Sequence, residues 1–116
     1  MASKPMQYTI IFSKKAKEQL KEIRDYIEEQ FFSRQAADNT MNNILTGLEK
    51  LEDFPFVGFN ADERVGEMIY PPHITRCLVL HEYLVFYHVL EKSKQVFISH
   101  IMHAKLDYLK FFRKDK

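Results

Sequence analysis

The sequence predicts an α+β fold, in which a helical hairpin packs on a small, mainly antiparallel four-stranded sheet in the order β-α-α-β-β-β with a short C-terminal helix. Three observations predict it. Apolar residues recur at helical spacing in the first half of the chain, and short β-branched and aromatic runs separated by tight turns fill the second half. Glycine and proline concentrate between Pro55 and Pro72, where the first pattern gives way to the second.

The first half contains one strand and two helices. Residues 8–12 are strand-like, and Ser13 follows at the position of a helix N-cap. We expect helices over about 14–30 and 34–53, the second one capped by Ser33 and ended by Phe54-Pro55. Because the link between them is short, the helices should form an antiparallel hairpin. The residues expected to pack this hairpin on the sheet are Leu20, Ile23, Ile27, Met41, Ile44 and Leu48.

The second half contains a loop and an antiparallel meander. Turn-forming residues fill segment 56–73, which is therefore expected to be a loop. Strands are expected over 74–80, 83–90 and 96–102, since only a few residues separate each from the next. Residues 104–112 could form a short terminal helix.

Length and composition indicate one soluble domain spanning residues 1–116. A chain of 116 residues buries roughly two-thirds of its unfolded surface. The hydrophobic content of 46% is too high for a disordered protein, and the net charge of +1 argues against broad, non-specific binding to nucleic acid. A single cysteine, Cys77, excludes an intrachain disulfide and suits a reducing compartment. With no signal-like or membrane-spanning run, the expected location is the cytoplasm, without membrane attachment.

The ordered set of elements resembles the ParE/RelE superfamily of toxins from type II toxin–antitoxin systems, and the ParE branch more closely. The likeness extends from Tyr8 to about Tyr108. It rests on the opening strand, the helical hairpin and the following residues: Leu51, Phe54-Pro55, Gly58, Arg76, Tyr83 to Tyr87, His103 and Asp107.

The resemblance implies a growth-inhibiting toxin that is neutralised by a cognate antitoxin encoded by an adjacent gene. A ParE-like member would act by binding DNA gyrase. The alternative is a RelE-like, ribosome-dependent endoribonuclease that cleaves mRNA. In either case we expect a hetero-oligomer with the antitoxin, contact with DNA only through the antitoxin, and no cofactor.

Arg76 and His103 are the candidate catalytic residues of the RelE-like alternative. Arg76 should share a strand face with Ile74 and Leu78, where its planar guanidinium could bind phosphate or antitoxin carboxylates on the open face of the sheet. A structural salt bridge, with Glu82 or Glu67, would explain it equally well.

His103 stands at the end of the last strand, where the RNA-cleaving members carry an acid–base residue, and it could transfer one proton. The usual companions are missing, because Leu84 and Ala104 occupy the places of an expected arginine and tyrosine. A strand-end histidine in a polar network is at least as good an explanation. His100 and His103 should point to opposite faces, so we expect no metal site.

The tail from Leu106 to Phe112 carries an apolar stripe with basic flanks. Such a helix could cap the core, or it could dock on a partner protein. The residues expected to contact the target or the antitoxin are Arg76, Tyr83, Tyr87, Lys105, Leu106, Tyr108, Leu109 and Phe112.

Overall fold

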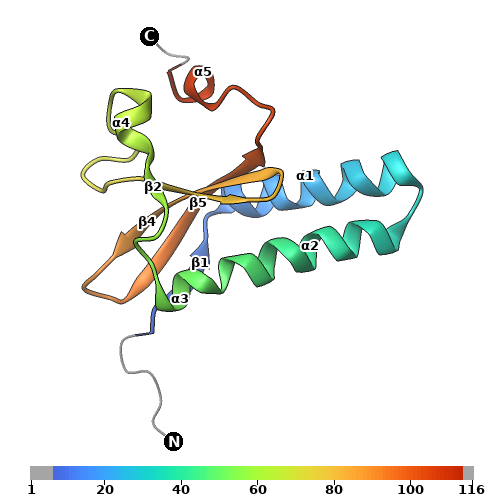
Figure 1. Cartoon of the computed structure of the whole chain (residues 1–116), viewed down its shortest axis with the longest axis horizontal. Coiled ribbons are helices and arrows are strands. Elements are labelled where there is room, and N and C mark those ends of the chain that lie inside the picture. Colours follow the sequence, from blue (N-terminus) through green and yellow to red (C-terminus); the bar gives the residue numbers. More distant parts are fainter. Residues whose placement is uncertain (1–6, 114–116) are drawn as a thin grey trace, which may run out of the picture.

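The computed structural model describes residues 7–113, which form one mixed sheet with helices on both faces (Figure 1). The strands are β1 (Thr9–Phe12), β2 (Phe59–Asn60), β3 (Arg76–Leu80), β4 (Tyr83–Leu90) and β5 (Gln95–His103). Within these residues they lie in the order β1-β5-β4-β3-β2, and only the β1–β5 pair is parallel. This confirms the predicted α+β class and the mostly antiparallel meander. The sheet has five strands instead of four, because two residues of the expected loop pair with β3.

The helical hairpin begins and ends close to where the sequence predicts. It consists of α1 (Lys14–Phe31), α2 (Arg34–Leu48) and the short α3 (Lys50–Asp53). Ser13 and Ser33 cap α1 and α2, each through its Oγ, which accepts a backbone N–H three residues on. The predicted helix 34–53 is interrupted at Glu49, whose N–H bonds to the carbonyl of Thr46 and tightens the turn.

No helix within residues 7–113 is long and apolar enough to cross a membrane.

The hairpin covers one face of the sheet and forms the main core. Ile44 and Leu48 of α2 pack there against Val85 and Tyr87 of β4. The six residues expected at this contact include Leu20, Ile23 and Met41, which are partly buried against the same core, and Ile27, which is 7% exposed. The packing expectation is therefore confirmed for five of the six residues, while Ile27 is buried but lies outside this core cluster.

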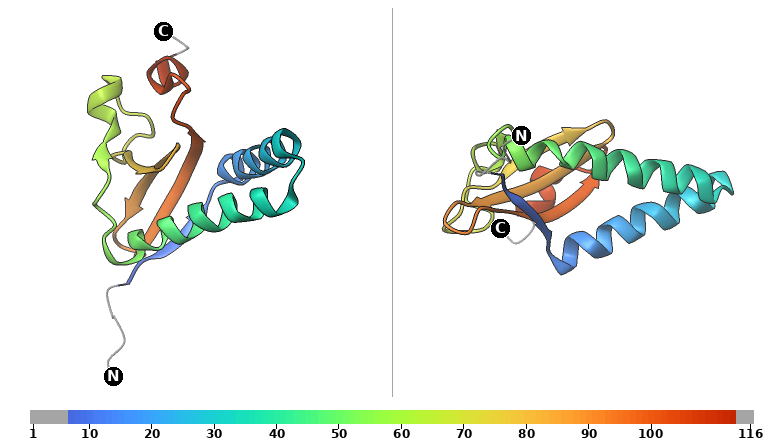
Figure 2. Two further views of the ribbon diagram at one scale, coloured as in Figure 1. Left: turned by 45° about the vertical axis from the view of Figure 1, so that its right-hand side comes forward. Right: turned by 90° about the horizontal axis from the view of Figure 1, so that it is seen from below.

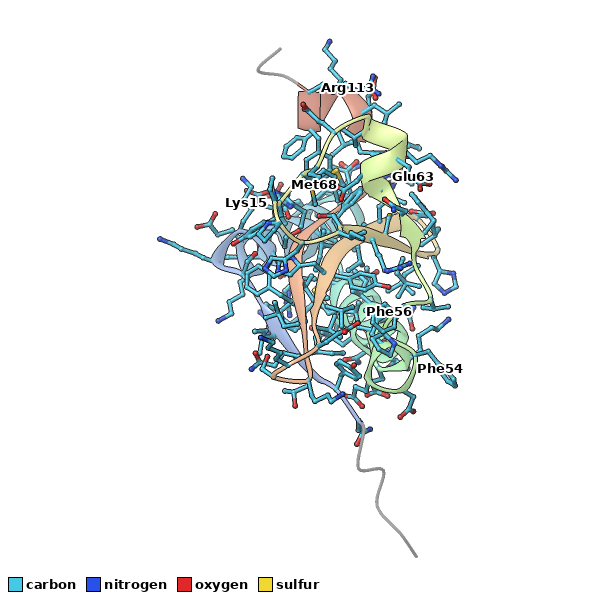
Figure 3. The ribbon with its side chains drawn as sticks, turned by 90° about the vertical axis from the view of Figure 1, so that its left-hand side faces the viewer. Lys15, Phe54, Phe56, Glu63, Met68 and Arg113 are labelled. Carbon is cyan, nitrogen blue, oxygen red and sulfur yellow. The ribbon has the colours of Figure 1, made fainter. Side chains whose placement is uncertain are left out.

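The second face of the sheet is covered by α4 (Ala61–Val65) and α5 (Tyr108–Arg113), which lie side by side (Figure 3). A smaller core forms between Phe86 of β4 and the aromatic residues of α5. The terminal helix begins at Tyr108, later than the expected 104–112. Helix α4 lies inside the segment expected to be a loop, and the Asp62 carboxylate holds this segment in place by accepting the N–H groups of Ile69 and Thr75.

A β-bulge in the β4–β5 ladder joins the sheet to α1. Phe86 pairs with His100 and Tyr87 with Ile98, so that Ser99 has no partner opposite it on β4. The Oγ of Ser13 donates to the carbonyl of Ser99 at 2.9 Å. The start of α1 is thus fixed on the bulge.

Leu48 tests the main core, because only 1% of it is exposed. We expect Leu48→Ala to lower the free energy of unfolding by about 2–5 kcal/mol. Leu45→Ala is the matched control on the same helix, since Leu45 is 44% exposed, and it should change the free energy by less than about 0.5 kcal/mol. Urea denaturation measures both. Equal effects of the two variants would contradict the placement of α2.

An aromatic stack under the 66–75 segment makes stability depend on pH. The rings of His73 and His88 are parallel, with centroids 4.5 Å apart, and Tyr70 and Phe97 contact His88. Burial lowers the pKa of His88 from its ordinary value of 6.5 to about 4, and the charge of His73 lowers it too. The unfolded chain therefore binds a proton at His88 below about pH 6.5, and the folded chain does not until about pH 4.

We expect the free energy of unfolding to fall as the pH falls from 6.5 to 4. His88→Phe keeps an aromatic ring in the stack and removes the titrating group. Its urea midpoint should exceed that of the wild type by more at about pH 5 than at about pH 7.5. A difference that is the same at both pH values would show that His88 does not contribute to this dependence.

Candidate functional site

An open groove lies between the hairpin and the end of the sheet. Figure 2 shows α1 and α2 running well past the strands, so that their inner faces have no sheet beneath them near the α1–α2 turn. Two adjoining cavities, of about 520 and 410 Å³, fill this space. They share four lining residues, which come from α1, β4, β5 and the segment after β5: Tyr26, Tyr83, His103 and Lys105.

The floor of the groove is apolar. In the first cavity it is made by Ile27, Ile44 and Leu80, and in the second by Ile23 and Ile101. At its mouth, Tyr26 is 61% exposed and Phe31 is 66% exposed. A concave surface with apolar residues at its base and aromatic residues at its edge is suited to a protein segment.

The polar rim of the groove centres on His103. Its Nε2 lies 3.4 Å from Oε1 of Glu82, and its Nδ1 accepts the backbone N–H of Lys105 at 3.0 Å. Tyr83 meets the imidazole edge-on, with ring centroids 5.3 Å apart. Burial raises the pKa of Tyr83, and the charges of Glu82 and Tyr26 raise it further, so its hydroxyl stays protonated and can donate a hydrogen bond. His103 thus belongs to the strand-end polar network that the sequence left open as an alternative.

Arg76 lies far from this groove. It is four residues from Leu80 along β3, about 13 Å, and His103 lies two strands away from β3, about 10 Å across the sheet. The two groups therefore cannot act on one phosphate in this conformation. Arg76 faces the same side as Leu78, which the hairpin covers, so the expectation that it lies on the open face is wrong.

The guanidinium of Arg76 bonds to backbone carbonyls. Its Nη1 donates to the carbonyls of Phe56 and Gly58 at 3.2 and 2.9 Å, and the cation lies over the Phe56 ring. Glu82, one of the two carboxylates expected to pair with it, contacts His103 instead. Arg76 therefore fastens the segment after α3 to the sheet.

Tyr87 shares this fastening role and is fully buried. Its hydroxyl accepts the N–H of Gly58 at 2.9 Å. A Cβ at Gly58 would lie 2.7 Å from both the carbonyl oxygen of Cys77 and the Tyr87 hydroxyl, so the site requires glycine. The expectation that Tyr87 contacts a partner is contradicted by this burial, because no part of the ring reaches the surface.

The C-terminal helix uses most of its apolar side chains inside the molecule. Tyr108 and Phe112 pack against Phe86, and Arg113 donates to the last carbonyls of α4. Leu109 is half-buried. Of the residues expected to contact a partner or to act in catalysis, four line the groove: Tyr83, Lys105, Leu106 and, as the catalytic candidate, His103.

The groove also contains residues that the sequence placed only in the core or did not single out. Ile23, Ile27 and Ile44 were expected to be buried under the hairpin, and Tyr26 and Phe31 carried no functional expectation. The helical spacing of these residues shows which face of each helix is apolar. It does not show that this face extends beyond the end of the sheet.

The histidines of β5 do not form a metal site. Within residues 7–113, histidine, cysteine and acidic side chains form no group of three that could hold a metal ion. His100 packs on Phe112 and His103 on Tyr83, which confirms that these histidines face opposite ways.

Together, the hairpin, the mixed sheet and the groove define a small α+β domain with an open, largely apolar groove at one end of its sheet. A search of curated proteins finds no significant match. The family model described as "ParE toxin of type II toxin-antitoxin system, parDE" matches residues 10–108, and the chain therefore belongs to the ParE toxin family. A solved structure, the chromosomal ParDE toxin–antitoxin system from P. aeruginosa, shares the fold with a TM-score of 0.65. That match has 16% sequence identity and covers 86% of this chain and 99% of the other.

Proposed function

We propose that this ParE-family chain inhibits growth as the toxin of its pair and is neutralised by an antitoxin segment that fills the groove. The groove itself carries the proposal. Its two cavities share lining residues from α1, β4, β5 and the segment after β5, and its floor is formed by aliphatic side chains. Exposing such an apolar surface to water is unfavourable for a monomer, and a bound partner segment would bury it.

An amphipathic helix of the antitoxin suits the groove best. Helices in grooves place apolar residues at intervals of three and four, which matches a floor of separate aliphatic side chains. The polar rim offers Lys105 and the Tyr83 hydroxyl to acidic and amide groups of the partner. The cognate antitoxin, encoded by an adjacent gene, would form a hetero-oligomer with this chain in the cytoplasm, and contact with DNA would run through the antitoxin. The similar P. aeruginosa structure is itself described as a ParDE system.

DNA gyrase is the proposed target of the free toxin, in preference to mRNA. Cleavage of RNA by its 2′-hydroxyl needs a cation and proton carriers around one phosphate. Arg76 and His103 lie at opposite ends of the sheet, and Arg76 is engaged with two carbonyls. The arrangement favours a toxin that acts by binding a protein.

Tyr26 tests the antitoxin site, because it lines both cavities and is largely exposed. We expect Tyr26→Ala to weaken antitoxin binding by about 10- to 100-fold, in the range of a truncated interface aromatic, with little change in thermal stability. Isothermal titration calorimetry with the purified antitoxin measures the affinity. Leu45→Ala is the control, since Leu45 is an exposed apolar residue on the hairpin that does not line either cavity. If both variants bind like the wild type, the antitoxin binds elsewhere.

The choice of target is tested with the toxin alone. We expect the purified chain to inhibit supercoiling by gyrase, and its expression in cells to leave mRNA intact while DNA breaks accumulate. Supercoiling assays and mapping of mRNA ends within minutes of induction measure the two outcomes. Prompt cleavage of ribosome-bound mRNA that is lost in His103→Ala would establish the endoribonuclease alternative instead.

A further inference from the structure

The turn between α1 and α2 exposes two aromatic side chains. Phe31 ends α1, Phe32 follows it, and Ser33 caps α2. Phe31 is 66% exposed and Phe32 is 95% exposed. Figure 2 shows this turn as the part of the hairpin farthest from the sheet, so the rest of the domain covers only part of Phe31 and almost none of Phe32.

Fold stability does not explain a phenylalanine at position 32. Its backbone is left-handed, with φ 49° and ψ 40°, and the cap N–H bonds to the carbonyl of Glu28. This conformation is unfavourable for an ordinary L-residue and is usually taken by glycine or asparagine at the end of a helix. The ring also leaves nearly all of its apolar area in water. Both the backbone and the exposure disfavour phenylalanine here.

The surroundings of the two rings are acidic. Segment 24–38 carries two arginines against four carboxylates, which gives a net charge of −2. Both arginines already contact carboxylates: Arg24 those of Glu28 and Asp38, and Arg34 that of Glu28. Such a surface repels the phosphates of a nucleic acid. This surface is complementary to a partner protein that has an apolar pocket with a basic rim. An aromatic side chain of the turn would fill the partner's pocket, and the carboxylates of the turn would face its basic rim.

The two phenylalanines do not face the same space. Phe31 lines the groove, whereas Phe32 does not line either cavity. An antitoxin helix in the groove would therefore cover Phe31 and stand beside Phe32. Four other aromatic side chains are also exposed, though each less than Phe32: Tyr26, Phe54, Phe56 and Tyr70. In α5, Tyr108 and Phe112 pack on Phe86.

We propose that Phe32 is the anchor by which the toxin binds its target protein, inserting into an apolar pocket with a basic rim. The inference rests on the proposed function, since it assigns the target contact of that toxin. It also gives a physical basis for neutralisation, because the antitoxin groove and the target anchor adjoin at the same turn and a bound antitoxin would block access to the anchor.

Phe32→Asn separates this role from folding. Asparagine tolerates the left-handed backbone, so the variant should fold and melt at the same or a higher temperature than the wild type. It should bind the antitoxin with unchanged affinity. We expect its affinity for purified gyrase to fall about 30-fold or more, the size typical of a lost aromatic anchor, and growth arrest on induction without antitoxin to be lost. Phe54→Asn is the control, because Phe54 is another exposed phenylalanine, 66% exposed, and lies at the far end of α3, away from the turn.

The outcomes separate the anchor from the proposed function. If the wild type arrests growth without affecting gyrase, the gyrase target is wrong, and loss of arrest in Phe32→Asn still supports the anchor. A variant that arrests growth like the wild type overturns the anchor and leaves the proposed function standing. If Phe32→Asn no longer binds the antitoxin, the ring contacts the antitoxin and the proposal is overturned. If the wild type is a dimer and the variant a monomer, the ring contacts a second copy of the chain and the proposal is likewise overturned. A wild type that arrests nothing overturns both.

Discussion

The groove depends on a mismatch in length between two neighbouring strands. β1 ends at Phe12, opposite Ile98, whereas β5 continues to His103. Beyond Ile98, no described strand forms hydrogen bonds with this edge of β5. A side chain of α1 takes the place of a strand there: the Oε1 of Gln19 accepts the buried N–H of Ile101 at 2.7 Å. A helix is bulkier than a strand and stands further off, so the side chains beyond this bond do not close on the sheet. The cavity that contains Gln19, Ile23 and Ile101 opens there.

The opposite end of the sheet is closed by the same kind of bonding. Arg76 and Tyr87 hold the segment after α3 through its carbonyls and the N–H of Gly58. The hairpin is therefore fastened at one end and free at the other.

Ion pairs from Arg24 to both helices keep the free end together without a sheet beneath it. The chain thus presents a preformed groove, which lowers the entropy lost when a partner binds.

Periodicity and capping residues were enough to predict the hairpin, the meander and the residues that pack between them, because Ser13, Ser33 and the spaced aliphatic residues act locally. The short β2 and α4 were not predictable in this way, since the Asp62 carboxylate that organises the segment bonds to residues 7 and 13 positions away. The sequence was equally unable to show which face of β4 each residue occupies. Almost every residue from Tyr83 to Leu90 is apolar or aromatic, so alternation could not separate the buried Tyr87 from the groove-lining Tyr83. The groove itself follows from the different lengths of β1, β5 and the hairpin helices, which no single segment encodes.

The position of the groove also determines how neutralisation can work. The hairpin is held in its arrangement beside the groove by the caps at Ser13 and Ser33 and by the ion pair of Arg24 with Asp38, so occupation of the groove is enough to explain neutralisation without a change of conformation. Under the proposed function, the antitoxin therefore acts by occupancy. The groove reaches Phe31, and Phe32 is the next residue along the chain, so a helix thick enough to fill the cavities also occupies the space that a target would need around the turn. Binding of antitoxin and binding of target then exclude each other through adjacent surfaces, and no conformational signal has to cross the domain.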